Sequence, residues 1–259
     1  MPSIRRLPVP VATRAPTGET TAHLVGREDA LLVDPAGRTD ALDDAVASRD
    51  VAHVAVTHTH RDHVGGISHY ARTTGATVWA RAGYEDRFER ATGVTPDRTF
   101  REGTTVTVAG APVTVLATPG HAPDHVAFAA GGDVLVGDLA VAEGSVFVGA
   151  TEGDMRAYLT ALRRLHARDP DRLLPAHGPT IDHPRERLAA LVAHRLDRER
   201  RVRDAVHAGA RTVDEVVDAA YDKDLTGVRD LAADTVAAHL AKLAVEGRVA
   251  WDGDRAGPA

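Results

Sequence analysis

The stretch THTHRDHVGG, residues 57–66, decides how the rest of the chain is interpreted. It places three histidines and one aspartate within six positions. It follows an apolar run at residues 51–56 that has the valine content of a buried strand, and it precedes residues 64–74, which we expect to form a helix opened by two glycines. The cluster is therefore predicted to lie on a strand-to-helix loop, where a rigid scaffold can hold several side chains toward one space.

The spacing within this loop favours metal binding. Neutral imidazole and carboxylate are ligands that zinc and similar divalent ions accept. His58 and His60 are two positions apart, so in an extended segment their side chains project to the same side. Asp62 and His63 follow from the turn at a different angle, which suits two adjacent metal ions better than one. The simpler alternative, a polar loop that happens to be rich in histidine, does not explain four ligand-type residues at the end of an apolar strand.

The composition is that of a globular protein with one large domain, or with one domain and a small appendage. The chain has 259 residues, of which 43% are hydrophobic and 26% are charged. Its net charge of −6 excludes a generally basic surface, so nucleic-acid binding would need a local basic patch. The absence of cysteine excludes disulfides, thiolate metal sites and a cysteine nucleophile.

The sequence shows no sign of targeting to a membrane. Residues 1–13 contain arginines but lack the long apolar core of a signal peptide. No apolar run approaches the length that is needed to span a bilayer. We therefore expect a cytoplasmic protein without a membrane partner.

The pattern of an apolar strand, a sharp turn and a ligand-type residue recurs later in the chain. Apolar runs precede the Pro–Gly turn at His121, the Gly–Asp pair at Asp138 and the turn at His177. The order of strands and helices predicts an α/β fold in which helices pack on a sheet. Separate strands deliver side chains to one edge when such sheets build a site, so we hypothesise that these residues converge with the histidine loop.

Two further residues are candidates for supporting the ligands. Asp34 ends an early strand before Pro35, and a carboxylate there can fix the tautomer of a ligating histidine. A plain turn residue is the alternative, and the sequence does not separate the two. His125 either contacts the site as a supporting group or caps the turn that carries His121.

The composition changes near residue 184, so we expect a catalytic domain over residues 1–183 and a smaller subdomain over residues 184–259. Three helices and then a strand resemble a winged-helix module. We expect these elements at residues 186–208, 212–221, 231–246 and 248–251.

An arginine-rich run lies in the first of these helices. Residues 194–203 contain five arginines and two acidic residues, which suits contact with nucleic-acid phosphates. A solvated helix face with intrahelical ion pairs is the more common outcome of such a run. The last helix is not basic, so sequence-specific binding to duplex DNA is not expected.

The ligand pattern resembles a known family. The motif HTHRDH at residues 58–63, with the later His121, Asp138 and His177, is similar to the metallo-β-lactamase superfamily over about residues 1–183. The resemblance implies a four-layer αβ/βα sandwich with a two-metal site at one edge. It implies that one metal takes His58, His60 and His121, that the other takes Asp62, His63 and His177, and that Asp138 bridges both.

The later part of the chain, with His177-Gly178-Pro179, then His194-Arg195 and then a three-helix end, resembles the beta-lactamase-like protein 2 group within that superfamily. This resemblance implies endoribonuclease activity on single-stranded RNA. It also implies that the basic helix lies beside the metal edge, which favours contact of Arg195 and Arg198 with substrate phosphates. The bridging Asp138 distinguishes the pattern from the β-lactamases proper, and the absence of cysteine excludes their cysteine-bearing subclass.

We therefore expect a metal-dependent hydrolase with two divalent ions, zinc being the expected metal, that acts on phosphodiester bonds of single-stranded RNA. Two ions roughly 3.5–4 Å apart hold a water and lower its pKa from about 16 toward 7, and the resulting hydroxide attacks phosphorus or a carbonyl carbon. Asp62 either orients the hydroxide or takes its proton, or it serves as a ligand only. A thioesterase of the glyoxalase II type, with a small-molecule substrate, and a nucleic-acid-binding regulator with a relic metal site are the alternatives.

Overall fold

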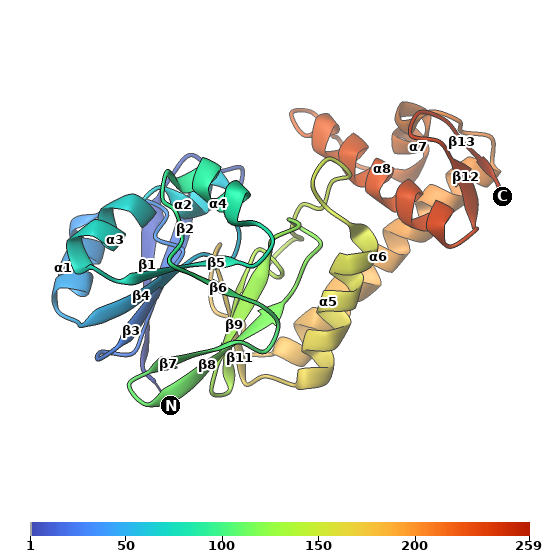
Figure 1. Cartoon of the computed structure of the whole chain (residues 1–259). Helices are drawn as coiled ribbons and strands as arrows, with labels where there is room; N and C mark the ends of the chain where they lie inside the picture. Colours follow the sequence, from blue (N-terminus) through green and yellow to red (C-terminus); the bar gives the residue numbers. More distant parts are fainter. Residues whose placement is uncertain (1) are drawn as a thin grey trace. The chain divides into compact units, whose positions relative to one another are not determined.

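The computed structural model describes residues 2–259 and divides the chain into two compact units (Figure 1). The first unit extends to Thr118 and also contains Asp124–Gly144 and Asp169–Pro184. The second unit consists of Pro119–Pro123, Ser145–Arg168 and Arg185–Ala259. Each unit therefore contains segments from separate parts of the chain, and the expected domain boundary after residue 183 stays a prediction.

The first unit contains a six-stranded sheet in the order β1-β2-β3-β4-β5-β6. The first three strands pair antiparallel, and the pairs from β3 to β6 are parallel. The strands are β1 (Ile4–Pro10), β2 (Glu19–Val25), β3 (Ala30–Val33), β4 (Val51–Ala55), β5 (Thr77–Arg81) and β6 (Arg98–Phe100). The helices between the parallel strands are α1 (Asp40–Ala47), α2 (Arg61–Val64), α3 (Ile67–Thr74) and α4 (Glu85–Thr92).

The second sheet of this unit has five strands in the order β11-β10-β9-β8-β7. Strands β7 to β10 pair antiparallel, and β11 is parallel to β10. The strands are β7 (Thr105–Val108), β8 (Ala111–Ala117), β9 (Val126–Ala130), β10 (Asp133–Gly137) and β11 (Arg172–Pro175). The ends of β10 and β11 lead to Asp138 and His177, as the sequence pattern predicts.

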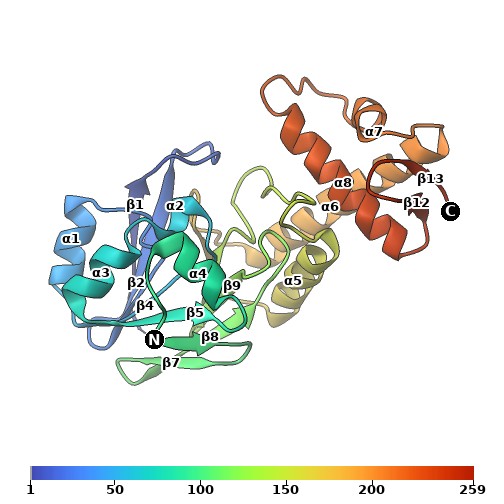
Figure 2. The same ribbon diagram turned by 45° about the horizontal axis from the view of Figure 1, so that its top comes forward.

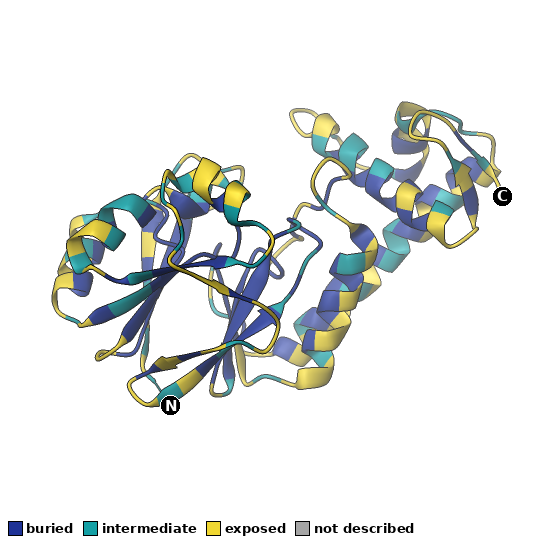
Figure 3. Cartoon of the chain, viewed as in Figure 1, coloured by how far each residue is buried: buried dark blue, intermediate teal, exposed yellow. Residues whose placement is uncertain are grey.

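Both faces of the central strand β3 are buried, which explains why this strand is continuously apolar, whereas the edge strands β1 and β6 also carry exposed side chains (Figure 3). Successive side chains of a strand point to opposite faces. Accordingly Leu32 packs in the cluster that also contains Leu42 of α1 and Ile67 of α3, whereas Leu31 packs in the cluster that contains Phe128 of β9. One face is therefore covered by helices, and the other packs against the second sheet.

The histidine loop does not continue into one helix, as expected for residues 64–74, but into two short helices, α2 and α3. The two glycines between them explain this difference. A Cβ atom on Gly65 would lie 2.4 Å from the carbonyl oxygen of Ala36, and one on Gly66 would lie 2.6 Å from that of Pro35. The Gly66 N–H donates a hydrogen bond of 2.7 Å to the Pro35 oxygen, so the loop lies directly against the turn that follows β3.

The second unit contains four helices and a two-stranded sheet in which β12 and β13 pair antiparallel (Figure 2). Its core includes Val202 of α6, Val216 of α7 and Leu240 of α8. The Thr212 side chain accepts from the Glu215 N–H and the Glu215 side chain from the Thr212 N–H, which forms the predicted capping box. The elements are α5 (Met155–Arg168), α6 (Pro184–His207), α7 (Val213–Ala220), α8 (Arg229–Val245), β12 (Val249–Trp251) and β13 (Ala256–Pro258).

Within residues 2–259, no helix has both the length and the apolar character that crossing a lipid bilayer requires.

Candidate metal centre

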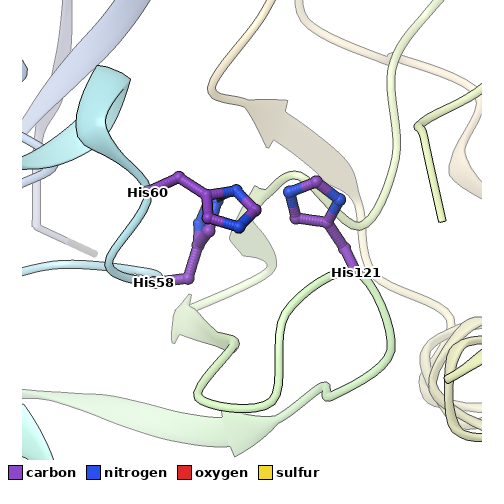
Figure 4. A group of neighbouring side chains, drawn as sticks. All are labelled: His58, His60 and His121. Carbon is purple, nitrogen blue, oxygen red and sulfur yellow. Dashed lines mark hydrogen bonds between the residues drawn. The ribbon is translucent and has the colours of Figure 1, made fainter. Parts of the chain in front are cut away.

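The structure brings all seven predicted ligand residues into three overlapping groups. Within each group, one ligand atom from each residue lies within 4.8 Å of the others. The groups are His58, His60 and His121; His58, His63 and Asp138; and Asp62, His63 and His177. In the first group the three imidazole rings gather around one space (Figure 4).

His63 lies at the centre of the first unit's part of this arrangement. Its side chain is fully buried, and its Nδ1 atom lies 3.1 Å from Oδ2 of Asp34. Asp34 is itself held by Thr57, whose backbone N–H and side-chain hydroxyl donate to its two oxygens at 2.6 and 2.8 Å. Asp34 is therefore held in place to orient the His63 ring. This is the supporting role that the sequence suggested as one of two alternatives for Asp34.

The opposite nitrogen of His63, Nε2, faces two carboxylates. It lies 3.7 Å from Oδ1 of Asp138 and 4.0 Å from Oδ1 of Asp62. It is buried and makes no hydrogen bond to any group in residues 2–259. A buried polar atom without a hydrogen bond is costly, so this nitrogen is placed as a metal ligand would be.

The electrostatics of the cluster also suit a cation. Burial lowers the pKa of His63, but the charges of Asp34, Asp138 and Asp62 outweigh it and raise this pKa to about 9. Burial likewise lowers the pKa of His177, but the Asp138 carboxylate, whose Oδ1 lies 3.3 Å from His177 Nε2, outweighs this effect and raises the pKa above the ordinary value. Carboxylates gathered in a low-dielectric interior attract positive charge, which protons or divalent cations can supply.

Backbone carbonyls fix the tautomers of two other histidines. His177 Nδ1 lies 2.8 Å from the carbonyl oxygen of Glu19, and His121 Nδ1 lies 2.7 Å from that of Phe147. Because a carbonyl oxygen only accepts, Nδ1 carries the proton in each ring, and the Nε2 lone pair of the neutral ring is available to a metal. In His177, Nε2 lies 3.3 Å from Oδ1 of Asp138 and 3.7 Å from Oδ2 of Asp62.

His125 supports the backbone that carries Asp138. Its Nε2 accepts a hydrogen bond of 3.1 Å from the Asp138 N–H, and its Nδ1 lies 2.8 Å from the Thr118 hydroxyl. Gly137, with φ of 48°, allows this approach, since a Cβ atom there would lie 2.9 Å from His125 Nε2. His125 therefore supports the main chain at Asp138, and its ring also lies beside that of His58, with ring centroids 5.1 Å apart.

Two residues that fix the site give no signal in the sequence. The hydroxyl of Thr13 donates to Oδ2 of Asp62 at 2.6 Å, and Arg6 donates to the Gly178 carbonyl oxygen at 2.6 Å and to the Thr180 hydroxyl at 3.1 Å. Both residues come from the N-terminal part of the chain, 49 or more positions from their partners. Only the folded chain brings them to the ligand loops.

The two arginines that were predicted to bind substrate are engaged by protein groups. Arg195 is 4% exposed, donates to the carbonyl oxygen of Val146 and lies over the Tyr158 ring. Arg198 donates to the Ala220 carbonyl oxygen, and its guanidinium carbon lies 3.5 Å from the centroid of the Tyr221 ring. Substrate contact by either residue stays a prediction, and these contacts do not favour it.

Comparison with known families identifies the fold and the class of protein. Residues 15–177 match the metallo-beta-lactamase superfamily, and residues 212–257 match the beta-lactamase associated winged helix domain. Because the first match covers more than half of the chain, the chain belongs to the metallo-beta-lactamase superfamily, a family of hydrolases. The predicted α/β sandwich with a C-terminal winged-helix part is confirmed.

Individual relatives sharpen this result. The chain is 30% identical over 224 residues to a beta-lactamase-like protein 2 homolog of Drosophila melanogaster, covering 81% of this chain and 73% of that protein. It is 27% identical over 259 residues to an atrochrysone carboxyl ACP thioesterase of Aspergillus novofumigatus, covering 90% and 76%. A metallo-beta-lactamase family protein of Thermus thermophilus shares the fold, with a TM-score of 0.79, 23% identity and coverage of 99% and 98%. The resemblance to the beta-lactamase-like protein 2 group is thereby confirmed.

Proposed function

We propose that the chain is a two-metal-dependent hydrolase that cleaves phosphodiester bonds in single-stranded RNA. The proposal of two metal ions rests on the position of the Asp138 carboxylate. Its Oδ1 lies 3.7 Å from His63 Nε2 and 3.3 Å from His177 Nε2, and it also forms a group with His58. A carboxylate shared between two groups of histidines suits a bridge between two cations.

The proposed ligand sets follow the three groups. His58, His60 and His121 would hold one cation, Asp62, His63 and His177 would hold the other, and Asp138 would bridge both. Nitrogen and carboxylate ligands suit zinc, which is the metal that we propose. When bound, the cations would activate a water molecule at neutral pH and stabilise charge on the oxygens of the transition state.

The chain's own residues orient these ligands and prepare Asp62 for proton transfer. Asp34 and the carbonyls of Glu19 and Phe147 hold the Nδ1 sides of three histidines, so that their Nε2 atoms face the centre. The Thr13 hydroxyl donates a hydrogen bond to Oδ2 of Asp62. We propose that the other oxygen, Oδ1, orients the attacking water or takes its proton; a role as ligand only is the simpler alternative.

The RNA part of the proposal rests on the relatives. The chain is similar over 81% of its length to beta-lactamase-like protein 2 homologues. The resemblance of the sequence to this group is what implies RNA cleavage. The second candidate, thioester hydrolysis, is supported by similarity over 90% of the chain to a relative that is named as a thioesterase. The gathered ligand residues argue against a regulator with a relic metal site, because a relic would be expected to have lost ligands.

A substrate panel tests the proposal. The purified, zinc-loaded chain would be incubated with single-stranded RNA, bis-p-nitrophenyl phosphate and S-lactoylglutathione, and metal per chain would be measured in the same preparation. We expect two zinc ions per chain and cleavage of the two phosphodiesters. Cleavage of the thioester alone would overturn the nuclease proposal in favour of the thioesterase. Binding of duplex DNA without any hydrolysis would favour the regulator. A cytoplasmic location stays a prediction.

A further inference from the structure

Helix α6 has two charged side chains in the middle of its buried stripe. Buried residues recur along it at intervals of three and four, as in any helix that packs on one side. They include Leu188, Leu191, Arg195, Glu199, Val202 and Val206. Burying a charge is costly unless it is paired or hydrogen-bonded, so each of these two positions requires a physical explanation.

Glu199 is explained by pairing with the neighbouring helix. Its Oε2 lies 2.7 Å from Nζ of Lys242 in α8, and its Oε1 lies 3.5 Å from the guanidinium of Arg248. This cluster joins α6 to α8 and accounts for a buried carboxylate. Arg195 has different partners: its guanidinium carbon lies 5.5 Å from the centroid of the Tyr158 ring, and its Nη2 donates to the backbone of Val146.

Val146 belongs to an irregular segment, residues 145–151, that is held at both ends by helices of the second unit. Arg195 of α6 holds its beginning. At its other end, Oδ1 of Asp234 in α8 accepts hydrogen bonds from the Ala150 and Thr151 N–H groups at 3.0 and 3.2 Å, and from the Thr151 hydroxyl at 3.2 Å. A segment without a strand or helix ladder depends on such side-chain contacts for its conformation.

The held segment is in direct contact with a predicted metal ligand. The carbonyl next to that of Val146 belongs to Phe147, and it accepts the hydrogen bond of 2.7 Å from His121 Nδ1. Because peptide groups are planar, only two dihedral angles separate the carbonyl that Arg195 holds from the one that orients His121. Tyr158 also abuts the adjacent Gly120, where a Cβ atom would lie 2.4 Å from the Tyr158 Cα.

We propose that Arg195 is a positioning residue for the metal ligand His121, acting through the backbone of residues 146–147. This inference rests on the proposed metal centre. Partners of a ligating histidine fix its ring orientation, and their loss typically lowers metal affinity 10- to 100-fold. Arg195 acts one step further out, so its loss disturbs the single metal that His121 holds, and leaves the metal held by Asp62, His63 and His177 bound.

Cobalt titration of the full-length chain tests this assignment. The metal-free wild type, Arg195→Met and Arg195→Lys would be titrated with Co²⁺, and both stepwise affinities would be obtained from the ligand-field absorption and from competition with a chelator. In Arg195→Met we expect one of the two affinities to fall about 10-fold, with an altered absorption band, and the other to stay unchanged. Arg195→Lys, which keeps a donor and a charge, should recover part of the loss.

Arg198→Met is the matched control. This arginine lies one turn further along α6 and likewise donates to a carbonyl and stacks on a tyrosine, but its partners are Ala220 and Tyr221. We expect both cobalt affinities to be unchanged in this variant. An equal loss in Arg198→Met, or two unchanged affinities in a folded Arg195→Met, would overturn the inference.

A second variant covers the case in which Arg195→Met does not fold, as judged by circular dichroism. Asp234→Ala removes the hydrogen bonds at the other end of the 145–151 segment and should lower the same single cobalt affinity. Two unchanged affinities in this variant would overturn the inference. If the wild type binds two cobalt ions but cleaves no phosphodiester in the substrate panel, the proposed substrate fails while the positioning role stands.

Discussion

The histidine loop of the first unit and helix α6 of the second both contain a cluster of charged or ligand-type residues, but the fold places the side chains of the two clusters differently. In the loop, three histidines and one aspartate lie within six positions, and all four enter groups whose ligand atoms lie within 4.8 Å of one another. In α6, five arginines lie within ten positions; Arg195 is buried, Arg200 and Arg201 are exposed, and the other two are half-buried. In the loop, the order of neighbouring residues already places the side chains together. In the helix, the environment of each arginine depends on what packs against the face that carries it.

The difference has a physical origin. Gly65 and Gly66 lie so close to the backbone of the preceding turn that no side chain fits there, and this contact holds the loop in one conformation. In a helix each residue turns by about 100°, so two arginines three positions apart lie near one face and the residues between them face elsewhere. Arg195 therefore lies in the interior while Arg200 is exposed to solvent.

The largest effect is expected for the loop and its bridging partner. His60→Ala and Asp138→Asn should each lower turnover by more than about 100-fold, because removing a ligand costs more than removing its hydrogen-bond partner. Circular dichroism and thermal unfolding should show a folded chain in both cases. Turnover that persists in either variant would contradict the ligand assignment.

Asp34→Asn comes next. The substitution keeps the side-chain shape and tolerates the φ of 52° at this position, but it replaces one acceptor oxygen beside His63 Nδ1 by a donor. We expect metal affinity to fall about 10- to 100-fold, measured by competition with a chelator. Asp133→Asn is the control, because that aspartate pairs with Arg172 at 2.6 Å, and it should leave the affinity unchanged. Equal affinities in both variants would show that Asp34 is a turn residue only.

Glu199→Gln tests the other buried charge of α6. We expect this substitution to lower the stability of the fold and to leave metal binding unchanged. Among residues 2–259, the change leaves Lys242 with the partly exposed Glu246 as its remaining ionic partner. We expect a loss of about 1–3 kcal/mol in the free energy of unfolding, measured by urea denaturation, with an unchanged metal content. A lower metal content with unchanged stability would contradict the separation of Glu199 from Arg195.

The same pair predicts how stability depends on pH. Burial raises the pKa of Glu199, but the neighbouring His239 and the Lys242 ammonium, 2.7 Å from its Oε2, outweigh it, so this pKa lies below the ordinary value. A lowered carboxyl pKa stabilises the folded state above the ordinary glutamate pKa, and this contribution disappears as the pH falls through the lowered value. The stability difference between wild type and Glu199→Gln should therefore shrink below about pH 4.

The smallest effect is expected for Arg200→Ala. Its guanidinium pairs with Asp197 at 2.7 Å, but both side chains are about half exposed, and such pairs contribute little. We expect the free energy of unfolding to change by less than about 0.5 kcal/mol and RNA affinity to change little, as measured by urea denaturation and filter binding. A strong loss of RNA affinity would instead show that the exposed arginines of α6 bind the substrate.

Much of the site could be predicted because its signals are local. The strand before residues 57–66, the ligand types within that loop, and the repeated strand-to-turn pattern before Asp138 and His177 all depend on short stretches of chain. For Asp34 the sequence leaves two roles open, a supporting carboxylate and a turn residue, and its contact with His63 favours the first. The sequence did not predict that two helices, α2 and α3, follow the loop in place of one. The division depends on close backbone contact at Gly65 and Gly66, and such a contact leaves no periodic pattern in the sequence.

The amino-acid order alone determined the family, through the resemblance of the motif at residues 58–63, and it indicated the strand ends that carry the candidate ligands, through apolar runs that end in sharp turns. Only the tertiary structure decided that Thr13 holds Asp62, that Phe147 orients His121 and that Arg195 is buried against Val146. These contacts join positions 26 to 49 residues apart. Partners this distant in the chain are chosen by packing, which no short stretch of sequence encodes.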